Sequence, residues 1–136
     1  MSTEQRTRAT GKITVKSYEP APYDEPADGP TLSRIHVEET FSGDIEAEGV
    51  VDFLQAQMAN GSASFVGIER VTGSLGQRLG SFLLQDQGTV SGSTVSGEWF
   101  VVPGSGSGDL AGLRGEGGFS AQLGESADIS LEYWFE

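Results

Sequence analysis

Alternation of apolar and polar residues with a period of two is the feature that most constrains how this chain can fold. Residues 31–43 place Ile35 and Phe41 on one face, and residues 126–135 do the same with Leu131. Such a period is typical of a β-strand with one buried face, because successive strand side chains point to opposite sides of the sheet. No helical period persists beyond about one turn. The sequence therefore predicts an all-β fold.

Seven or eight such strands are predicted, and short turns join most of them. The segments with the clearest strand pattern are residues 11–18, 31–43, 45–58, 62–76, 78–90, 94–102 and 126–135. A single open sheet of this length would leave two edges exposed, and closing the sheet removes them. A barrel is therefore favoured, with a two-layer sandwich as the alternative. Glycines inside the strands support the barrel, because they permit sharp bends: Gly49, Gly67, Gly73 and Gly97.

The connections between strands carry their own signals. Asn60 and Gly61 predict a hairpin with a type I′ turn, since both residue types tolerate positive φ. Residues 19–30 hold four of the five prolines and predict a long irregular connection. The glycine-rich residues 103–118 predict a second connection, with a short 3₁₀ turn from Leu110 to Leu113, and we expect a β-bulge near Gly49. The polar residues 1–10 are expected to form a disordered tail, followed by one barrel domain over residues 11–136.

Charge and composition exclude several classes of function. The 136 residues contain 8 Lys plus Arg and 20 Asp plus Glu, a net charge of −12. The chain therefore offers no basic patch for nucleic acid or for anionic lipid. The absence of cysteine excludes disulfides, thiolate catalysis and cysteine-bound zinc. No segment approaches the roughly 20 apolar residues of a membrane helix and no signal peptide is visible, so we expect a cytoplasmic protein.

Four stretches of the sequence resemble a known family. They are TFSGDIEAEG (40–49), ASFVGIERVTGSL (63–75), GSFLLQDQG (80–88) and VVPGSGSGDLAGLRGEGGFSA (101–121). The chain resembles an uncharacterised bacterial family of domains of unknown function, grouped with the allene oxide cyclase-like (dirigent-like) barrels. This resemblance implies one closed, eight-stranded antiparallel barrel with a largely apolar lumen, assembled as a dimer or trimer. The family often has histidine where this chain has Asp86, so a role that depends on histidine there does not carry over.

Polar residues that the alternation sends inward are the candidate site. Glu39, Glu69, Asp86 and Tyr133 share the parity of apolar neighbours. A buried carboxylate costs several kcal/mol unless it is paired or protonated, and such groups often act as acids, bases or ligand anchors. We predict Glu39 and Glu69 as catalytic residues. We predict four ligand-binding residues: Phe65, Asp86, Trp99 and Tyr133.

Structural roles are the alternative for each of these candidates. Glu39 or Glu69 could pair with Arg34, Arg70 or Arg114, and a register slip of one residue would turn them outward. Trp99 could simply fill the barrel core, because small eight-stranded barrels are often packed solid.

Other motifs are given structural interpretations. Residues 106–111 formally match a dinucleotide fingerprint, but more glycines follow and the required helix cannot form. Asn60 to Ser62 form a glycosylation sequon that is better explained as the hairpin turn. His36 is the only histidine and is expected on a solvated, salt-bridged face. Glu46 and Glu48 are expected to face solvent, and neither a metal site nor a cofactor is predicted.

The sequence leads to two hypotheses of function. In the first, the barrel binds a small apolar molecule in its lumen and acts as an isomerase or cyclase, with Glu39 or Glu69 transferring a proton. In the second, it is a non-catalytic module that works by self-association. An internal cavity of a few hundred Å³ favours the first hypothesis. A filled lumen with an apolar patch outside favours the second.

Overall fold

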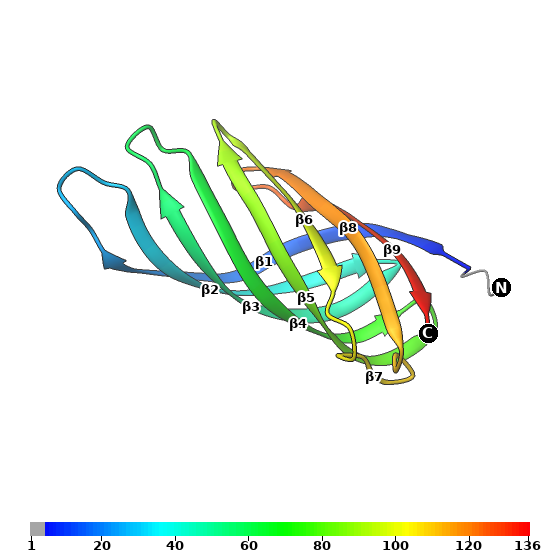
Figure 1. The fold of residues 1–136 in the computed structure, drawn as a ribbon. Coiled ribbons are helices and arrows are strands. Elements are labelled where there is room, and N and C mark those ends of the chain that lie inside the picture. Colours follow the sequence, from blue (N-terminus) through cyan, green and yellow to red (C-terminus); the bar gives the residue numbers. More distant parts are fainter. Residues whose placement is uncertain (1–4) are drawn as a thin grey trace.

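The computed structural model describes residues 5–136 and consists of strands without any helix (Figure 1). The strands are β1 (Thr7–Asp24), β2 (Thr31–Gly43), β3 (Ile45–Gln57), β4 (Ala63–Leu75), β5 (Arg78–Ser91), β6 (Thr94–Val101), β7 (Ser107–Gly108), β8 (Leu113–Gln122) and β9 (Ala127–Phe135). Because the described chain has no helix, it contains none that could cross a membrane.

The sheet closes on itself. Its order is β4-β3-β2-β1-β9-β8-β6-β5, and β4 also pairs with β5. That pairing is antiparallel and continuous from Ala63 opposite Val90 to Leu75 opposite Arg78. The short β7 adds only two residue pairs, against the start of β5. The fold is therefore the predicted closed, eight-stranded antiparallel barrel, and the sandwich alternative is excluded.

Strand β1 is much longer than the sequence pattern suggested. Residues 1–4 of the predicted disordered tail lie outside the described residues, but the prediction is wrong for residues 7–10, which pair with β9. The predicted irregular connection at 19–30 is also wrong up to Asp24, because Pro20 and Pro22 continue the pairing with β2. Proline lacks the N–H that a second neighbour would require. It is tolerated here because, in the described chain, β9 pairs with β1 only as far as Ile13.

Two local predictions also need correction. Gly49 pairs in regular register with Glu39 and Val71, so there is no bulge at Gly49. The Asn60–Gly61 hairpin forms, but only Gly61 has a positive φ (88°), so the turn is not type I′. Instead, the Asn60 side-chain oxygen accepts hydrogen bonds from the backbone N–H of Ser62 at 2.9 Å and from its hydroxyl at 2.6 Å.

One end of the barrel is plugged. Leu110 in the β6–β8 connection and Leu113 at the start of β8 are fully buried among the side chains of the strands. This connection turns through hydrogen bonds from Leu110 N–H to Ser107 O and from Leu113 N–H to Leu110 O, each 3.1 Å long. The glycine-rich motif therefore builds a turn rather than a nucleotide-binding helix. The result is an apolar core that fills this end of the lumen.

Several inward-facing phenylalanine rings lie against glycines on the neighbouring strand. The cross-strand pairs are Phe53 with Gly67, Phe65 with Gly88 and Phe119 with Gly97. A Cβ at Gly67 would lie 2.7 Å from a ring carbon of Phe53, closer than real Cβ atoms approach. The strand glycines therefore make room for rings that lie along the inner wall, a role beyond the bends expected from the sequence.

We predict that Gly88→Ala destabilises the barrel. A Cβ there would meet Phe65 Cζ and the backbone oxygen of Ser96, both at 2.6 Å. In an open strand the same change stabilises by about 0.5–1 kcal/mol, whereas here the overpacking should cost about 1–3 kcal/mol. Urea unfolding measures the difference, with exposed Gln87→Ala as the control, expected within about 0.5 kcal/mol of wild type. A stabilised Gly88→Ala would show that the ring does not occupy this space.

Candidate functional site

Three carboxyl side chains lie inside the barrel. Glu39 on β2, Glu69 on β4 and Asp86 on β5 are 7%, 1% and 3% exposed, respectively. Their positions follow from the strand register, because each alternates with outward-facing neighbours on its own strand. We call these three residues the carboxyl cluster. The inward direction predicted from the sequence is confirmed, and the register slip is excluded.

Glu39 and Glu69 contact each other directly. Their carboxyl groups share a hydrogen bond, so at least one of them carries a proton when the bond forms. The Oε2 atom of Glu69 lies over Gly49, in space that a side chain there would fill, and it has no hydrogen-bond partner. Gly49 is the cross-strand partner of Glu39. The glycine therefore lets the second carboxyl group reach the first.

The arginines considered as partners for this cluster are elsewhere. Arg34 pairs with Asp52 at 3.6 Å, and Arg114 pairs with Glu136 at the C-terminal end of the described chain. Arg70 is exposed on the outer face of β4. The alternative in which an arginine neutralises Glu39 or Glu69 is therefore wrong, and the buried charge must be limited by protonation.

Burial raises the pKa of every member of the cluster. For Asp86, burial and then the charge of Glu39 raise the pKa from 3.8 to about 8. For Glu69, burial, the charge of Glu39, the hydrogen bond with Glu39 and the charge of Asp86 raise the pKa well above its ordinary value. Burial also raises the pKa of Glu39, but the hydrogen bond from Glu69 partly opposes that rise. Because this hydrogen bond raises the pKa of Glu69 and lowers that of Glu39, we assign Glu69 as its donor and Glu39 as the group that ionises first.

A cavity of about 630 Å³ occupies the unplugged part of the lumen. Glu39 and Asp86 line it, whereas Glu69 does not. Its entrance is formed by β1 and by the β8–β9 turn, where β9 no longer pairs with β1. The remaining lining is mainly apolar and aromatic: Ile13, Val15, Tyr18, Ile35, Val37, Phe53, Phe65, Val90, Val95, Trp99, Phe119, Ala121, Leu123 and Ala127.

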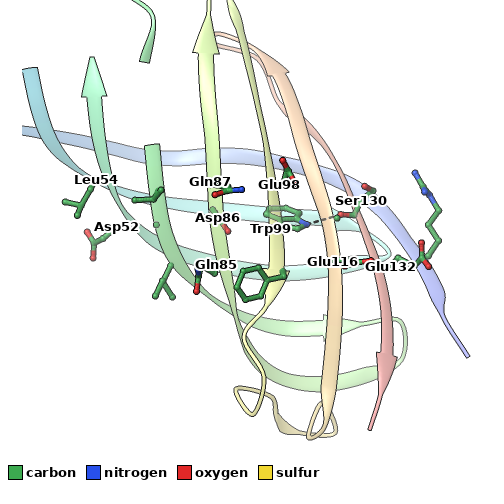
Figure 2. Close-up of a pocket in the computed structure, with 16 residues that line it drawn as sticks. Asp52, Leu54, Gln85, Asp86, Gln87, Glu98, Trp99, Glu116, Ser130 and Glu132 are labelled. Atoms are coloured by element: carbon green, nitrogen blue, oxygen red, sulfur yellow. Dashed lines mark hydrogen bonds between the residues drawn. The ribbon is translucent and has the colours of Figure 1, made fainter. Parts of the chain in front are cut away.

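Aromatic rings form a continuous wall of this cavity. Ring centroids are 5.1 Å apart for Phe53 and Phe65, 6.2 Å for Phe65 and Phe119, and 5.1 Å for Phe119 and Trp99. The indole N–H of Trp99 donates to the backbone oxygen of Ser130 at 3.0 Å, which fixes the ring (Figure 2). Trp99 is thus both a packed core residue and a wall of the cavity.

Of the predicted ligand-binding residues, Tyr133 is misplaced. Phe65, Asp86 and Trp99 line the cavity, but Tyr133 packs against the plugged core, with its hydroxyl near Gly76 in the β4–β5 turn. The sequence could not show this separation from the cavity, because strand alternation gives the face of a residue but not its depth in the barrel.

Three other aromatic residues of the lining were missed: Phe53, Phe119 and Tyr18. Phe53 and Phe119 each have an inward-facing ring opposite a glycine on the next strand, and this pairing is the feature that could have identified them. Tyr18 follows the irregularity between Val15 and Ser17, where simple alternation fails.

The remaining candidate residues lie on the outer wall. His36 contacts Asp52 at 3.0 Å and Glu38 at 3.7 Å, as expected for a salt-bridged face. Glu48 pairs with Lys16 at 3.2 Å. Within residues 5–136, no group of three His, Cys, Asp or Glu side chains is arranged to hold a metal ion, and this includes the carboxyl cluster.

A larger hollow of about 1040 Å³ is lined by outward-facing residues of several strands and also by the buried Asp86 and Trp99 (Figure 2). Leu54, Val66, Ile68 and Phe100 line part of it and are between 42% and 53% exposed. Leu54 pairs directly with Val66 across β3 and β4, and Gln85 pairs with both Ile68 and Phe100. The molecule therefore has both features named above as discriminating, an internal cavity and an external apolar patch.

Comparisons with known proteins identify a family and a solved structure that are similar to this chain. A family model described as "Protein of unknown function (DUF3224)" matches residues 9–133. A crystal structure of a protein of unknown function from the DUF3224 family of Shewanella oneidensis MR-1 is 34% identical to this chain, with a TM-score of 0.77. The match covers 97% of this chain and 99% of that one. No curated protein gives a significant match.

The raised pKa of Asp86 predicts a specific pH dependence of stability. In the unfolded chain an aspartate ionises near pH 4, whereas folded Asp86 keeps its proton up to about pH 8. Unfolding therefore releases a proton between these values, and the free energy of unfolding falls as the pH rises from about 4 to about 8. Asp86→Asn, which stays neutral, should be more stable than wild type by a few kcal/mol above pH 8 and similar at pH 4.

Urea unfolding from pH 4 to pH 9 measures this difference. Asp28→Asn, in an exposed turn, is the control and should follow the wild-type curve throughout. Parallel curves for Asp86→Asn and wild type would contradict the raised pKa.

Proposed function

This chain belongs to the DUF3224 family, and from that premise we propose that it binds a small, largely apolar molecule in its lumen and isomerises it by moving a proton. The observation that carries the proposal is the carboxyl cluster at the inner end of an apolar cavity, without a basic partner among the described residues. A native state tolerates such a costly arrangement most readily where the groups have a chemical task.

The cavity supports the binding step. Its volume of about 630 Å³ lies within the range of small-molecule sites, which are mostly apolar with a few placed polar groups. The plugged core below would stop a ligand at the level of Glu39 and Asp86. The aromatic wall offers flat surfaces for a ring or an unsaturated chain.

The Glu39–Glu69 pair supports the proton transfer. Glu39 ionises first and faces the cavity, so it is the base, and Glu69 donates the hydrogen bond that keeps Glu39 ionised. Glu39 would take a proton from one ligand atom and return it to another, so that a double bond shifts and no proton is gained or lost. A base with a pKa raised towards the working pH is suited to this step. Asp86 would anchor the polar end of the ligand.

The proposed kinship with the allene oxide cyclase-like barrels rests on the same features. A closed eight-stranded barrel with an apolar lumen agrees with what the sequence resemblance implied. Because one fold hosts many activities, this kinship adds only an analogy.

Native mass spectrometry of the protein purified from its own host tests the binding step. We expect a copurifying small molecule on the wild-type protein. Ala121→Trp, which fills the cavity from β8, should lose it, whereas Ser120→Trp, on the outward face of the same strand, should retain it. Empty wild-type protein, or retention of the molecule by Ala121→Trp, would contradict lumen binding.

The proton step is tested on the captured molecule. Returned to wild-type protein in D2O, it should gain deuterium at one position. Glu39→Gln should bind the molecule without this exchange, because the amide cannot act as a base. Exchange at the wild-type rate by Glu39→Gln would overturn the assigned role.

Self-association is a second candidate function, supported by the apolar outer face. Ile68 lies on this face. Arg70 is two residues further along β4, and Glu98 on β6 pairs with Gln87 on β5. Neither Arg70 nor Glu98 has an ion pair within the described residues. A two-fold axis near Ile68 would bring Arg70 towards Glu98 of the partner subunit, as a self-complementary interface requires.

Light scattering coupled to gel filtration tests this assembly. Wild-type protein should have twice the chain mass of 14.3 kDa. Ile68→Glu should be monomeric, because it places a charge in the centre of the interface. Leu79→Glu, at a position 64% exposed near the start of β5 and outside this face, should remain dimeric. A monomeric wild type, or a dimeric Ile68→Glu, would remove this candidate.

A further inference from the structure

We infer that the ligand of the lumen carries a protonated amine beside an aromatic or other apolar body, and that Asp86 is its counter-ion. This inference rests on the proposed function, since it names the class of molecule that the cavity takes. Every charged side chain that lines the cavity is acidic: Glu39, Asp86 and Glu125. No described lysine, arginine or histidine lines it.

Asp86 has a buried carboxyl oxygen that accepts no hydrogen bond within the described residues. Its side chain is 3% exposed, and its Oδ1 atom has no hydrogen-bond partner. Its cross-strand neighbours are Trp99 and Gly67, and the ring of Phe53 lies over Gly67. Asp86 therefore shares the lining of the cavity with Trp99 and Phe53. A ligand N–H would satisfy the unpaired oxygen, which is costly to leave bare.

The surroundings of Asp86 favour a cation over other ligands. Asp86 without a ligand keeps its proton up to about pH 8. An ammonium group would compensate the charge that Asp86 acquires on giving up that proton, which no cation of the described residues does. The faces of Phe53, Phe65 and Trp99 attract a cation as well as an apolar body. An anion would be repelled by the carboxyl cluster and by the net charge of −12. A neutral alcohol could donate one hydrogen bond but would leave Asp86 protonated, so it would gain no ion pair.

Glu125 adds a second acidic position along the same path. It lies in the β8–β9 turn and lines the entrance of the cavity, while Glu39 and Asp86 lie at its inner end. A cation entering from solvent would thus meet negative charge first at the mouth and again at the floor. Such an arrangement raises the local concentration of cations relative to anions.

Isothermal titration at pH 7 with three probes of similar shape tests the inference. The probes are 2-phenylethylamine, 2-phenylethanol and 3-phenylpropanoate. We expect the amine to bind roughly ten-fold or more tightly than the alcohol, a difference of about 1.4 kcal/mol, and the carboxylate not to bind. Asp86→Asn should abolish the preference for the amine over the alcohol, whereas the exposed control Asp28→Asn should keep it. Phe119→Leu should weaken amine binding by a smaller factor, since one ring face is lost.

The other outcomes are distinct. If the alcohol binds as tightly as the amine, the inference is overturned while lumen binding stands. If the amine preference survives in Asp86→Asn, the assigned counter-ion is wrong. If none of the probes binds, the inference is also overturned, and the mass spectrometry of host-purified protein separately decides whether the lumen holds any ligand.

Discussion

Burial of three carboxyl groups without a basic partner is the constraint on which the rest of this structure depends. Moving an ionised carboxylate out of water costs several kcal/mol, so the barrel can hold Glu39, Glu69 and Asp86 together only by retaining protons. The hydrogen bond between the two glutamates shares one such proton. The plugged core on one side and the aromatic wall on the other keep water away from the group, and both depend on how the barrel closes.

The same strand pairings position both the aromatic wall of the barrel and the acidic groups of the site. Gly49 lies opposite Glu39 and leaves room for the carboxyl group of Glu69. Gly67 lies opposite Asp86 and leaves room for the ring of Phe53. The glycines that let rings lie along the wall thus also open the space in which the acidic groups meet the cavity. The stability of the barrel and the geometry of the site are therefore coupled. A methyl group added at Gly49 or Gly67 would disturb both.

Much of this arrangement could be predicted from the sequence, and the limits have physical causes. Alternation identified the strands and sent Glu39 and Glu69 inward, because the side-chain period of a strand is two. It could not show that these two residues touch, since contact depends on register between strands. It also could not show that Tyr133 lies at the plugged end, because depth along the barrel axis follows from strand stagger. The end of β1 was not predicted, because the sequence pattern treats Pro20 as the end of a strand, whereas proline is tolerated at an unpaired strand edge.

NMR titration of the carboxyl carbons can measure whether the carboxyl cluster holds protons at neutral pH. Carbon-detected spectra from pH 3 to pH 10 follow Glu39, Glu69 and Asp86 individually. Asp86 should titrate near pH 8, Glu39 should ionise above its ordinary range, and Glu69 should ionise after Glu39. Titration of all three near pH 4, as for exposed carboxylates, would show that the cluster does not hold protons at neutral pH.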